Sequence, residues 1–410
     1  MKTSRILATA TIAAVSVALT GCGSKGEAGG DAGASSGTLT IGASISLTGK
    51  TAREGVLTQE GYQLCQEKVN AKGGVKVGDK MLKLDIKYQD DTSKPDTAAS
   101  LVDQFNDQGI KLILGSYGSA NTEAQAAVIE RNNQVMVDSS GADDKIFAKG
   151  YKRTFAVLSP ASEYAASIVK ALADLASPKP TSVAFLSADD GFSKTAADGG
   201  VAAAKAAGFT VTGPELFPNG ATDVSSALNK VKGSAPDVII GSVHLAEGVA
   251  IVKQVKELGL KPKAIGETVA PPTPDFVTTL GAAADGVLGS SQWTKAVSGK
   301  DDYFGDASAY DADIQKAFGH AAGYHNAEAS AACLALVLAT EKAGSTDPTA
   351  VRDALAALDV TTFFGRVKFD ATGKNVTKPM VVIQIQGGKA VTVWPKDMAE
   401  GSLVWPALGS

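Results

Sequence analysis

Short apolar segments alternate with amphipathic helical segments along most of this 410-residue chain, and this alternation limits the possible folds more than any other feature. In the first part, strands are expected at 39–45, 82–88, 112–114 and 135–137, with helices at 55–70, 96–105 and 121–131. After Pro160 the alternation begins again and continues to about residue 265. Units of this kind form parallel sheets with helices on both faces. Because the length exceeds one ordinary core, we predict an α/β protein with two doubly wound parallel-sheet lobes.

The segments after residue 270 are less regular and include a proline-rich loop, two helices and a set of short C-terminal strands. We expect them to complete both domains. The predicted first lobe is 38–158 plus 271–362, and the predicted second lobe is 159–270 plus 363–410. Such a path crosses between the lobes more than once, which predicts a multi-strand hinge that closes around a ligand.

Residues 111–130, KLILGSYGSANTEAQAAVIE, indicate a strand, a Gly-Ser loop and a helix. Unpaired N–H groups and the helix dipole make such a helix start suitable for a carboxylate or phosphate. Ser119 and Thr122 add hydroxyl donors there. The plan recurs at 236–258, where the acid Glu247 stands at the helix start. An anion site in one half and a carboxylate in the other suit a zwitterion held between two lobes.

Residues 1–21 have the pattern of a signal peptide, with a short basic segment followed by an apolar one. The segment ends in Leu19-Thr20-Gly21-Cys22, which is similar to the bacterial lipobox and implies cleavage before Cys22 and lipidation of that residue. The alternative is a chance cysteine beside a secretory signal. Residues 22–37 are a Gly/Ala/Ser-rich tether. Together they predict an extracytoplasmic protein anchored to the membrane by lipid on Cys22.

Two further cysteines, Cys65 and Cys333, lie in apolar surroundings. Cys65 shares a helical stripe with Tyr62 and Val69, and Cys333 lies in the run AACLALVLA. Buried free thiols are the favoured interpretation. A disulfide between the two stays open at this point.

The sequence offers no catalytic or metal-binding pattern. His244, His320 and His325 are not at metal-ligand spacing, and HExxH, CxxC and GxSxG motifs are absent. We therefore expect that the protein has no metal, no cofactor and no enzymatic activity. Paired acids such as Asp189-Asp190 are expected to be solvated loop charges. The formal net charge of -4, without a basic cluster, gives no reason to expect a nucleic-acid partner.

Several stretches, taken in order, resemble the solute-binding proteins of ABC importers in the branched-chain amino-acid (Leu/Ile/Val)-binding group. They are IGASISLTG at 41–49, EGYQLCQEKVNAKGG at 60–74, YQDDTSKPDTAASLVDQF at 88–105, LILGSYGSANT at 112–122, the run APDVIIG…E…LGL at 235–260 and FFGRVKFDATG at 363–373. The resemblance implies a periplasmic-binding-protein type I fold and an ABC permease in the membrane as partner. We also expect the protein to be a monomer.

Taken position by position, the resemblance places Ser119 at the ligand carboxylate and Glu247 at the ligand ammonium. It gives Ser140 further backbone and hydroxyl contacts, and it sets Phe192, on a predicted loop, against the ligand. Tyr117 is a further candidate for the cleft wall.

Two positions depart from the family pattern. Glu54 stands where a ligand-stacking Tyr is common, and Ala142 where a Thr contacts the ammonium. These departures admit a polar or larger solute, so Glu54 joins the candidate binding residues. Trp293 and Tyr324 are candidate pocket walls.

The predicted function is that of a lipid-anchored, extracytoplasmic solute-binding component of an ABC importer. Its expected solute is an amino acid or a related small carboxylate, bound in the cleft between the lobes. The alternative is a sensory module of the same fold that feeds a separate signalling partner. Genes for a permease and an ATPase beside this one would favour transport.

Overall fold

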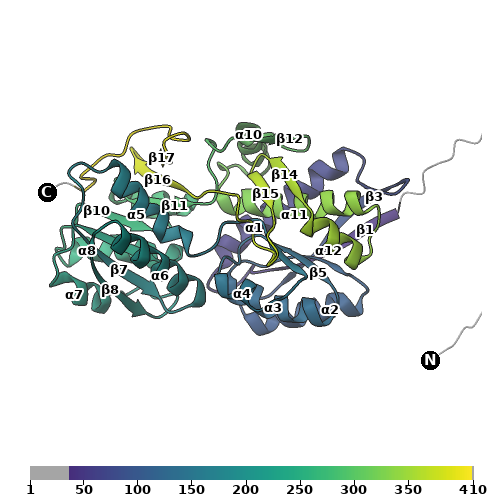
Figure 1. Cartoon of the computed structure of the whole chain (residues 1–410), viewed down its shortest axis with the longest axis horizontal. Helices are drawn as coiled ribbons and strands as arrows, with labels where there is room; N and C mark the ends of the chain where they lie inside the picture. The colour runs from purple at the N-terminus through teal and green to yellow at the C-terminus, as the bar shows by residue number, and fades with distance from the viewer. Residues whose placement is uncertain (1–36, 409–410) are drawn as a thin grey trace, which may run out of the picture. The chain divides into compact units, whose positions relative to one another are not determined.

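The computed structural model describes residues 37–408, all within one compact unit. The predicted signal peptide, Cys22 and the tether up to residue 36 lie outside the described residues. Two β-sheets, each covered by helices, define two lobes (Figure 1). The predicted two-lobed α/β fold is confirmed.

The first lobe is built on a six-stranded sheet of order β2-β3-β1-β4-β5-β6. Its strands are β1 (Gly37–Ile45), β2 (Val75–Val77), β3 (Lys80–Asp90), β4 (Leu112–Leu114), β5 (Val135–Asp138) and β6 (Thr154–Ala156). Its helices are α1 (Ala52–Ala71), α2 (Pro95–Asp107), α3 (Ser119–Arg131), α4 (Asp144–Ala148), α10 (Ala307–Phe318), α11 (Tyr324–Ala343) and α12 (Pro348–Ala356). Apart from β2, which is antiparallel to β3, these strands pair in parallel.

The second lobe is built on a seven-stranded sheet of order β17-β16-β11-β10-β9-β7-β8. Its strands are β7 (Ser182–Ala188), β8 (Thr210–Phe217), β9 (Val238–Ser242), β10 (Ala264–Glu267), β11 (Leu288–Ser291), β16 (Val381–Gln386) and β17 (Lys389–Trp394). Its helices are α5 (Glu163–Leu175), α6 (Gly191–Ala206), α7 (Ser225–Lys232), α8 (Leu245–Glu257), α9 (Pro274–Leu280) and the 3-10 turn η1 (Gly281–Ala284). Two small ribbons complete the described chain, β12 (Lys300–Asp301) with β13 (Gly305–Asp306), and β14 (Asp359–Thr362) with β15 (Gly365–Lys368).

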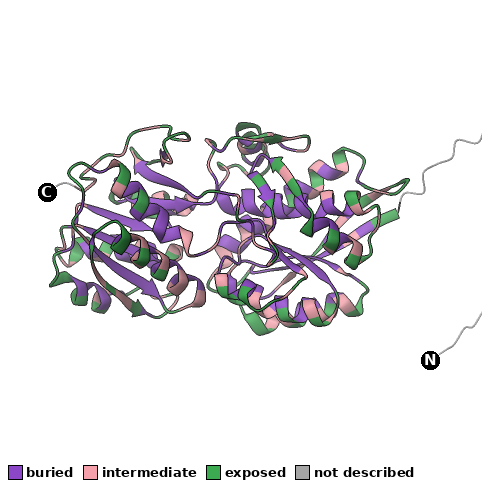
Figure 2. Ribbon diagram, in the orientation of Figure 1, coloured by how far each residue is buried: buried purple, intermediate pink, exposed green. Residues whose placement is uncertain are grey.

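The central strands of both sheets are buried along their length, as expected for parallel strands covered on both faces (Figure 2). Helix α11 is also buried along most of its length, and it packs against α1. A helix that is apolar all round belongs inside a core. The polar residues that α11 carries, such as Glu328, are therefore held in the interior of the protein.

Cys65 on α1 and Cys333 on α11 form a disulfide, so the expectation of two free thiols is wrong. Both residues are fully buried, as the apolar surroundings predicted. The two helices lie side by side, which brings together cysteines that are 268 positions apart in the sequence. Local sequence carries no information about such a contact.

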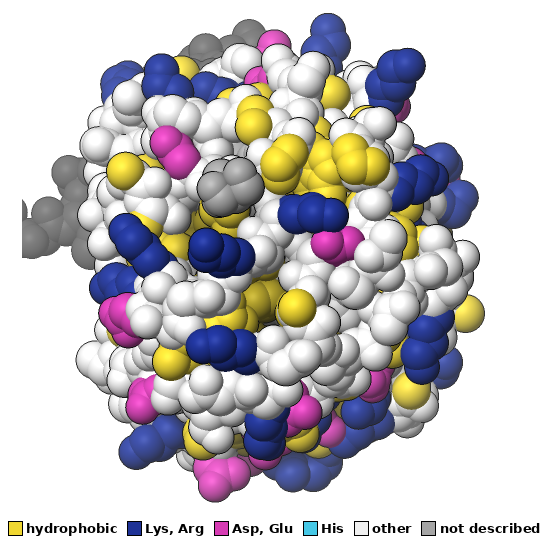
Figure 3. All heavy atoms as spheres, turned by 90° about the vertical axis from the view of Figure 1, so that its left-hand side faces the viewer, with side chains coloured by type: hydrophobic (Ala, Val, Ile, Leu, Met, Phe, Trp, Pro, Cys, Tyr) yellow, Lys and Arg dark blue, Asp and Glu magenta, His cyan; other side chains and the backbone are white. Residues whose placement is uncertain are grey.

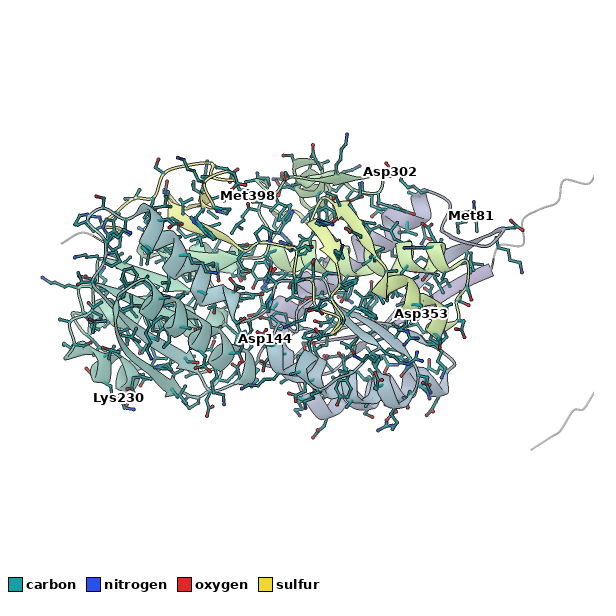
Figure 4. All side chains as sticks on the ribbon, viewed as in Figure 1. Met81, Asp144, Lys230, Asp302, Asp353 and Met398 are labelled. Atoms are coloured by element: carbon teal, nitrogen blue, oxygen red, sulfur yellow. A yellow bond between two sulfur atoms is a disulfide. The ribbon has the colours of Figure 1, made fainter. Side chains whose placement is uncertain are left out.

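In the C-terminal part of the chain, the strands pair with other sheets than the predicted lobe boundaries imply. Strand β11, assigned to the first lobe from the sequence, pairs with β10 and belongs to the second sheet. The segment around Lys374, assigned to the second lobe, forms a bridge with Ala156 at the edge of the first sheet. The chain therefore crosses between the sheets after β6, after β11 and before β16. Asp144, labelled in Figure 4, accepts a hydrogen bond from the backbone N–H of Ser162 (3.1 Å) at the first crossing.

The surface of the second lobe shows no segregation of charge on the face drawn in Figure 3, where basic, acidic and apolar side chains are intermixed. Between residues 37 and 408, none of the helices is long and apolar enough to cross a bilayer.

Candidate ligand-binding site

Two connected cavities lie between the lobes, at the carboxyl ends of the parallel strands. The inner chamber has a volume of about 20 Å³ and the outer cavity about 200 Å³. Both are lined by residues of the loops after β4, β7 and β9, and the loop after β5 contributes Ser140 to the inner chamber. Open α/β sheets bind ligands at this edge.

The first lobe supplies an anion-binding helix end. Helix α3 begins at Ser119, two residues earlier than expected, and its N-cap is Gly118 with φ of 90°. Only glycine adopts this left-handed backbone readily, so the loop can turn directly into the helix. Ser119 lines both cavities, and its Oγ accepts a hydrogen bond from the backbone N–H of Asp143 (3.0 Å). The free N–H groups of the first helical turn therefore lie at the cavity wall.

Thr122, also predicted to bind ligand, serves the neighbouring loop in this structure. It is fully buried, and its hydroxyl donates to Oδ1 of Asp138 (2.8 Å). The same carboxyl group accepts from the backbone N–H of Gly141 (2.8 Å). Burial raises the pKa of Asp138 to about 6, although these hydrogen bonds oppose the shift. The loop after β5 is thus wound around Asp138, which sets the position of Ser140.

Ser140 and α11 form a polar group on the wall of the inner chamber. The hydroxyl of Ser140 donates to Oε1 of Glu328 (2.9 Å), and Nδ1 of His325 lies 3.2 Å from the same oxygen. Burial raises the pKa of Glu328 well above its usual value. Burial, together with the charges of His244 and Arg53, lowers the pKa of His325 to about 3, so its ring is neutral at pH 7.

On the second lobe, His244 faces the chamber from the N-cap of α8. Its Nε2 lies 3.3 Å from Oδ2 of Asp190, which caps α6 by accepting from the backbone N–H of Ser193. Burial alone would lower the pKa of His244, but the hydrogen bond and charge of Asp190, with the charges of Glu247 and Glu54, raise it to about 9. The expectation that Asp190 is a solvated loop charge is wrong, because this carboxylate is mostly buried against an imidazolium.

Aromatic rings complete the wall. Phe192 lies in the first turn of α6 rather than on a loop, with its ring centroid 5.0 Å from that of Tyr164 and 5.5 Å from that of His244. Tyr117 and Tyr324 flank His325 at 5.3 Å and 4.0 Å. All of these residues line the inner chamber. The other aromatic candidate, Trp293, packs instead on Tyr310 and Phe363 in the first-lobe core.

Within residues 37–408, the two predicted acids Glu247 and Glu54 line neither cavity. Oε1 of Glu247 accepts a hydrogen bond from the backbone N–H of Gly220 (2.5 Å). Burial raises the pKa of Glu54, although the charge of His244 and a backbone hydrogen bond from Leu245 oppose the shift. Glu54 therefore contacts the start of α8 from the first lobe.

The residues that sequence reasoning missed are Glu328, His325, Tyr164 and His244. Glu328 and His325 lie in a helix whose sequence is typical of an apolar core. An acid within such a helix is unusual, and it was the feature of the sequence that could have indicated a binding residue. The part of the chain that the structure describes contains no group of three His, Cys, Asp or Glu residues placed to hold a metal ion. The chamber instead combines a helix N-terminus, a buried acid with one unpaired oxygen and aromatic walls, a set of groups that suits a small polar organic molecule.

Residues 38–390 match the model of the periplasmic binding protein family, and the chain belongs to this family. Among curated relatives, the chain is 26% identical to Leu/Ile/Val-binding protein homolog 7 of Brucella abortus, over 90% of this chain and 94% of that one. It is 27% identical to homolog 8 of the same species, over 88% and 91% of the two chains.

Solved structures share the fold. The leucine-binding protein LivK of Thermotoga maritima superposes with a TM-score of 0.78 at 20% identity, over 87% of this chain and 98% of that one. The substrate-binding protein LivJ of Streptococcus pneumoniae, in complex with isoleucine, gives 0.75 at 22% identity, over 90% and 100%. A solute-binding protein from R. palustris in complex with benzoate gives 0.73 at 16% identity, over 91% and 97%. At these identities the likeness concerns the fold alone.

Proposed function

We propose that this protein is the solute-binding component of an ABC importer and that it binds an amino acid or a related small carboxylate in the inner chamber. The names of its curated relatives, which are Leu/Ile/Val-binding protein homologues, support this assignment. Two structural neighbours were solved with an aliphatic amino acid and with benzoate, and both of these ligands carry a carboxylate.

The observation that carries the proposal is the chamber between the lobes with the start of α3 at its wall. In this proposal Ser119 and the first N–H groups of α3 bind the solute carboxylate, and the position of Ser119 at the start of α3 and on the chamber wall supports this role. The aromatic rings of Tyr164, Phe192 and Tyr324 cover the apolar part of the solute. A micromolar dissociation constant corresponds to about -8 kcal/mol, which a few charge-assisted hydrogen bonds and apolar burial can supply.

The remaining parts of the proposal concern the cellular setting. The mature protein is held at the extracytoplasmic face of the membrane by lipid on Cys22, with residues 22–37 as a tether. It acts as a monomer and delivers the solute to a membrane permease. The lipobox-like motif and the preceding signal-like segment support this part.

A thermal-shift screen of amino acids, hydroxy acids and aromatic acids, followed by calorimetry, tests the function, because a ligand that binds only the folded state raises the melting temperature. The variant Ser119→Ala is expected to weaken the best solute about 10- to 100-fold, since it removes a hydrogen bond to a charged group. The control Ser225→Ala changes the first residue of α7, a helix start away from both cavities, and should leave affinity unchanged. A screen without a binder, or equal affinity in the Ser119 variant, would contradict the proposal.

A further inference from the structure

The wall of the inner chamber that α11 forms carries two buried polar atoms without partners. Glu328 and His325 are each only 1% exposed. Oε2 of Glu328 and Nε2 of His325 have no hydrogen-bond partner anywhere in residues 37–408. Since the great majority of buried polar groups in proteins are paired, two unpaired atoms on one chamber wall point to a ligand.

Both unpaired atoms act as hydrogen-bond acceptors when Glu328 is ionised. Nδ1 of His325 faces a carboxylate oxygen at 3.2 Å, which places the ring proton on Nδ1 and leaves the lone pair on Nε2. The low pKa of His325, about 3, keeps the ring from taking a second proton. A ligand group that satisfies both atoms must therefore bring its own N–H or O–H donors.

The surroundings of Glu328 favour a donor with positive charge. Among the described residues, its one ion-pair contact is with His325, which is neutral. The charge of Lys378 acts on Glu328, but the Nζ of Lys378 donates to the backbone oxygen of Gln292, and burial lowers the pKa of Lys378 to about 7. The rings of Tyr117 and Tyr324 flank the site, and aromatic faces attract cations. A buried carboxylate without a cationic partner is costly, so the solute is the natural source of that partner.

The other acid considered for this role is already engaged. Oε1 of Glu247 accepts the backbone N–H of Gly220, and in residues 37–408 this side chain lines neither cavity. Glu328, by contrast, lines the same chamber as Ser119. It is also bonded to Ser140, on the loop beside the start of α3.

We propose that Glu328 and His325 bind an ammonium group of the solute, and that the solute therefore carries both a carboxylate and an ammonium group. This inference rests on the proposed function and narrows it to zwitterionic or cationic amino acids. It assigns to Glu328 the role that the family resemblance implies for Glu247. The carboxylate is held at Ser119, and the ammonium is held at Glu328 and His325, which line the same chamber.

The test compares two probes that differ only in the ammonium group. The first is whichever of the twenty amino acids gives the largest thermal shift, and the second is the 2-hydroxy acid with the same side chain. Calorimetry is expected to show that Glu328→Gln weakens the amino acid at least about 10-fold but changes the hydroxy acid by less than about 3-fold. The control Glu341→Gln lies on the same helix and contacts Lys76 and Tyr303 instead, so neither probe should respond to it.

Proton release gives a second readout that needs no variant. Burial raises the pKa of Glu328, opposed by the hydrogen bond from Ser140 and the charge of Lys378 and reinforced by Asp138. His325 is neutral and does not compensate. An empty chamber thus favours a protonated Glu328, and an arriving ammonium ionises it. Calorimetry in two buffers of different ionisation enthalpy should show a proton released with the amino acid and none with the hydroxy acid.

The other possible results show whether the ammonium assignment, the proposed function or both are wrong. If Glu328→Gln leaves amino-acid affinity unchanged, or weakens both probes equally, the ammonium assignment is wrong. If the wild type binds hydroxy acids or benzoate as well as it binds amino acids, this inference falls while the proposed function stands. If the wild type binds neither amino acids nor carboxylates, both fall.

Discussion

The hydroxyl of Tyr117, in the first lobe, lies 3.1 Å from Nδ1 of His244, in the second lobe, and joins the two sides of the chamber. The other ring nitrogen of His244 contacts Asp190 within the second lobe. With its pKa raised to about 9, the imidazole is charged at neutral pH and donates in both directions. The contact between the lobes thus depends on one buried positive charge.

His244 predicts a pH dependence of stability. Its folded-state pKa, about 9, lies above the ordinary value of 6.5, so its contribution is complete below pH 6.5 and is lost as pH rises through 9. The shift corresponds to roughly 3 kcal/mol at most. The free energy of unfolding, measured with urea, should therefore change less between pH 6 and pH 9.5 in His244→Gln than in the wild type. The control His320→Gln, at an imidazole that pairs with Glu60 outside both cavities, should keep the wild-type difference.

The disulfide predicts a loss of stability on reduction. Cys65 and Cys333 close a loop across 268 positions, and a bridge of this kind typically adds about 2–5 kcal/mol by restricting the unfolded chain. The double variant Cys65→Ser/Cys333→Ser should unfold at lower denaturant concentration and lose its sensitivity to dithiothreitol. Cys22→Ser serves as the control, because that change leaves the bridge in place. An unchanged unfolding midpoint under reducing conditions would show that the two thiols are not bonded in solution.

Glu267 predicts a stabilising substitution. It is fully buried at the end of β10, and neither carboxyl oxygen has a partner among the described residues. Burial, with the charge of Glu247, raises its pKa to about 8. Stability is therefore lost as pH rises from 4.5 through 8, since the unfolded chain gives up this proton first. Glu267→Gln should raise the free energy of unfolding at pH 8 by on the order of 2–4 kcal/mol and have less effect near pH 5.

The comparison for Glu267 is Glu257→Gln, at the exposed end of α8, which should change stability little at either pH. A Glu267→Gln variant with the wild-type slope of stability against pH would mean that the buried carboxyl does not titrate as described.

Gln292 predicts a link between the lobe crossings and the chamber. Its side chain accepts from the backbone N–H of Ser159 (3.0 Å) and donates to the backbone oxygen of Ser159 and to the hydroxyl of Tyr164 (2.9 Å). The hydroxyl of Ser159 in turn donates to the backbone oxygen of Lys378 (2.7 Å), on the third crossing. Gln292→Leu leaves several buried groups unpaired, each worth about 1–3 kcal/mol. The melting temperature should fall. Calorimetry should also show weaker solute binding, because the hydroxyl of Tyr164 loses its hydrogen bond from Gln292. An unchanged affinity would show that the hydrogen bonds of Gln292 at the lobe crossings do not affect solute binding in the chamber.

The helix end at Ser119 was predictable because its causes are local. An apolar strand, a Gly-Ser loop and a helix follow one another within 111–130, and consecutive elements of this type place the loop at the sheet edge. Tyr117 was a candidate for the same reason, since it follows β4, whereas Phe192 was placed against the ligand by the family resemblance. Glu247 was placed correctly at the start of its helix, but its side-chain contact with Gly220 depends on a loop 27 positions away.

The sequence by itself determined the two α/β lobes, their strand-to-helix order and the helix end that suits a carboxylate, because hydrophobic periodicity and turn residues act over a few positions. Only the tertiary structure decided the Cys65–Cys333 bridge, the place of β11 in the second sheet and the position of Glu328 on the chamber wall. These depend on which distant surfaces pack together. A buried acid in an apolar helix looks the same in the sequence whether it faces a core or a chamber.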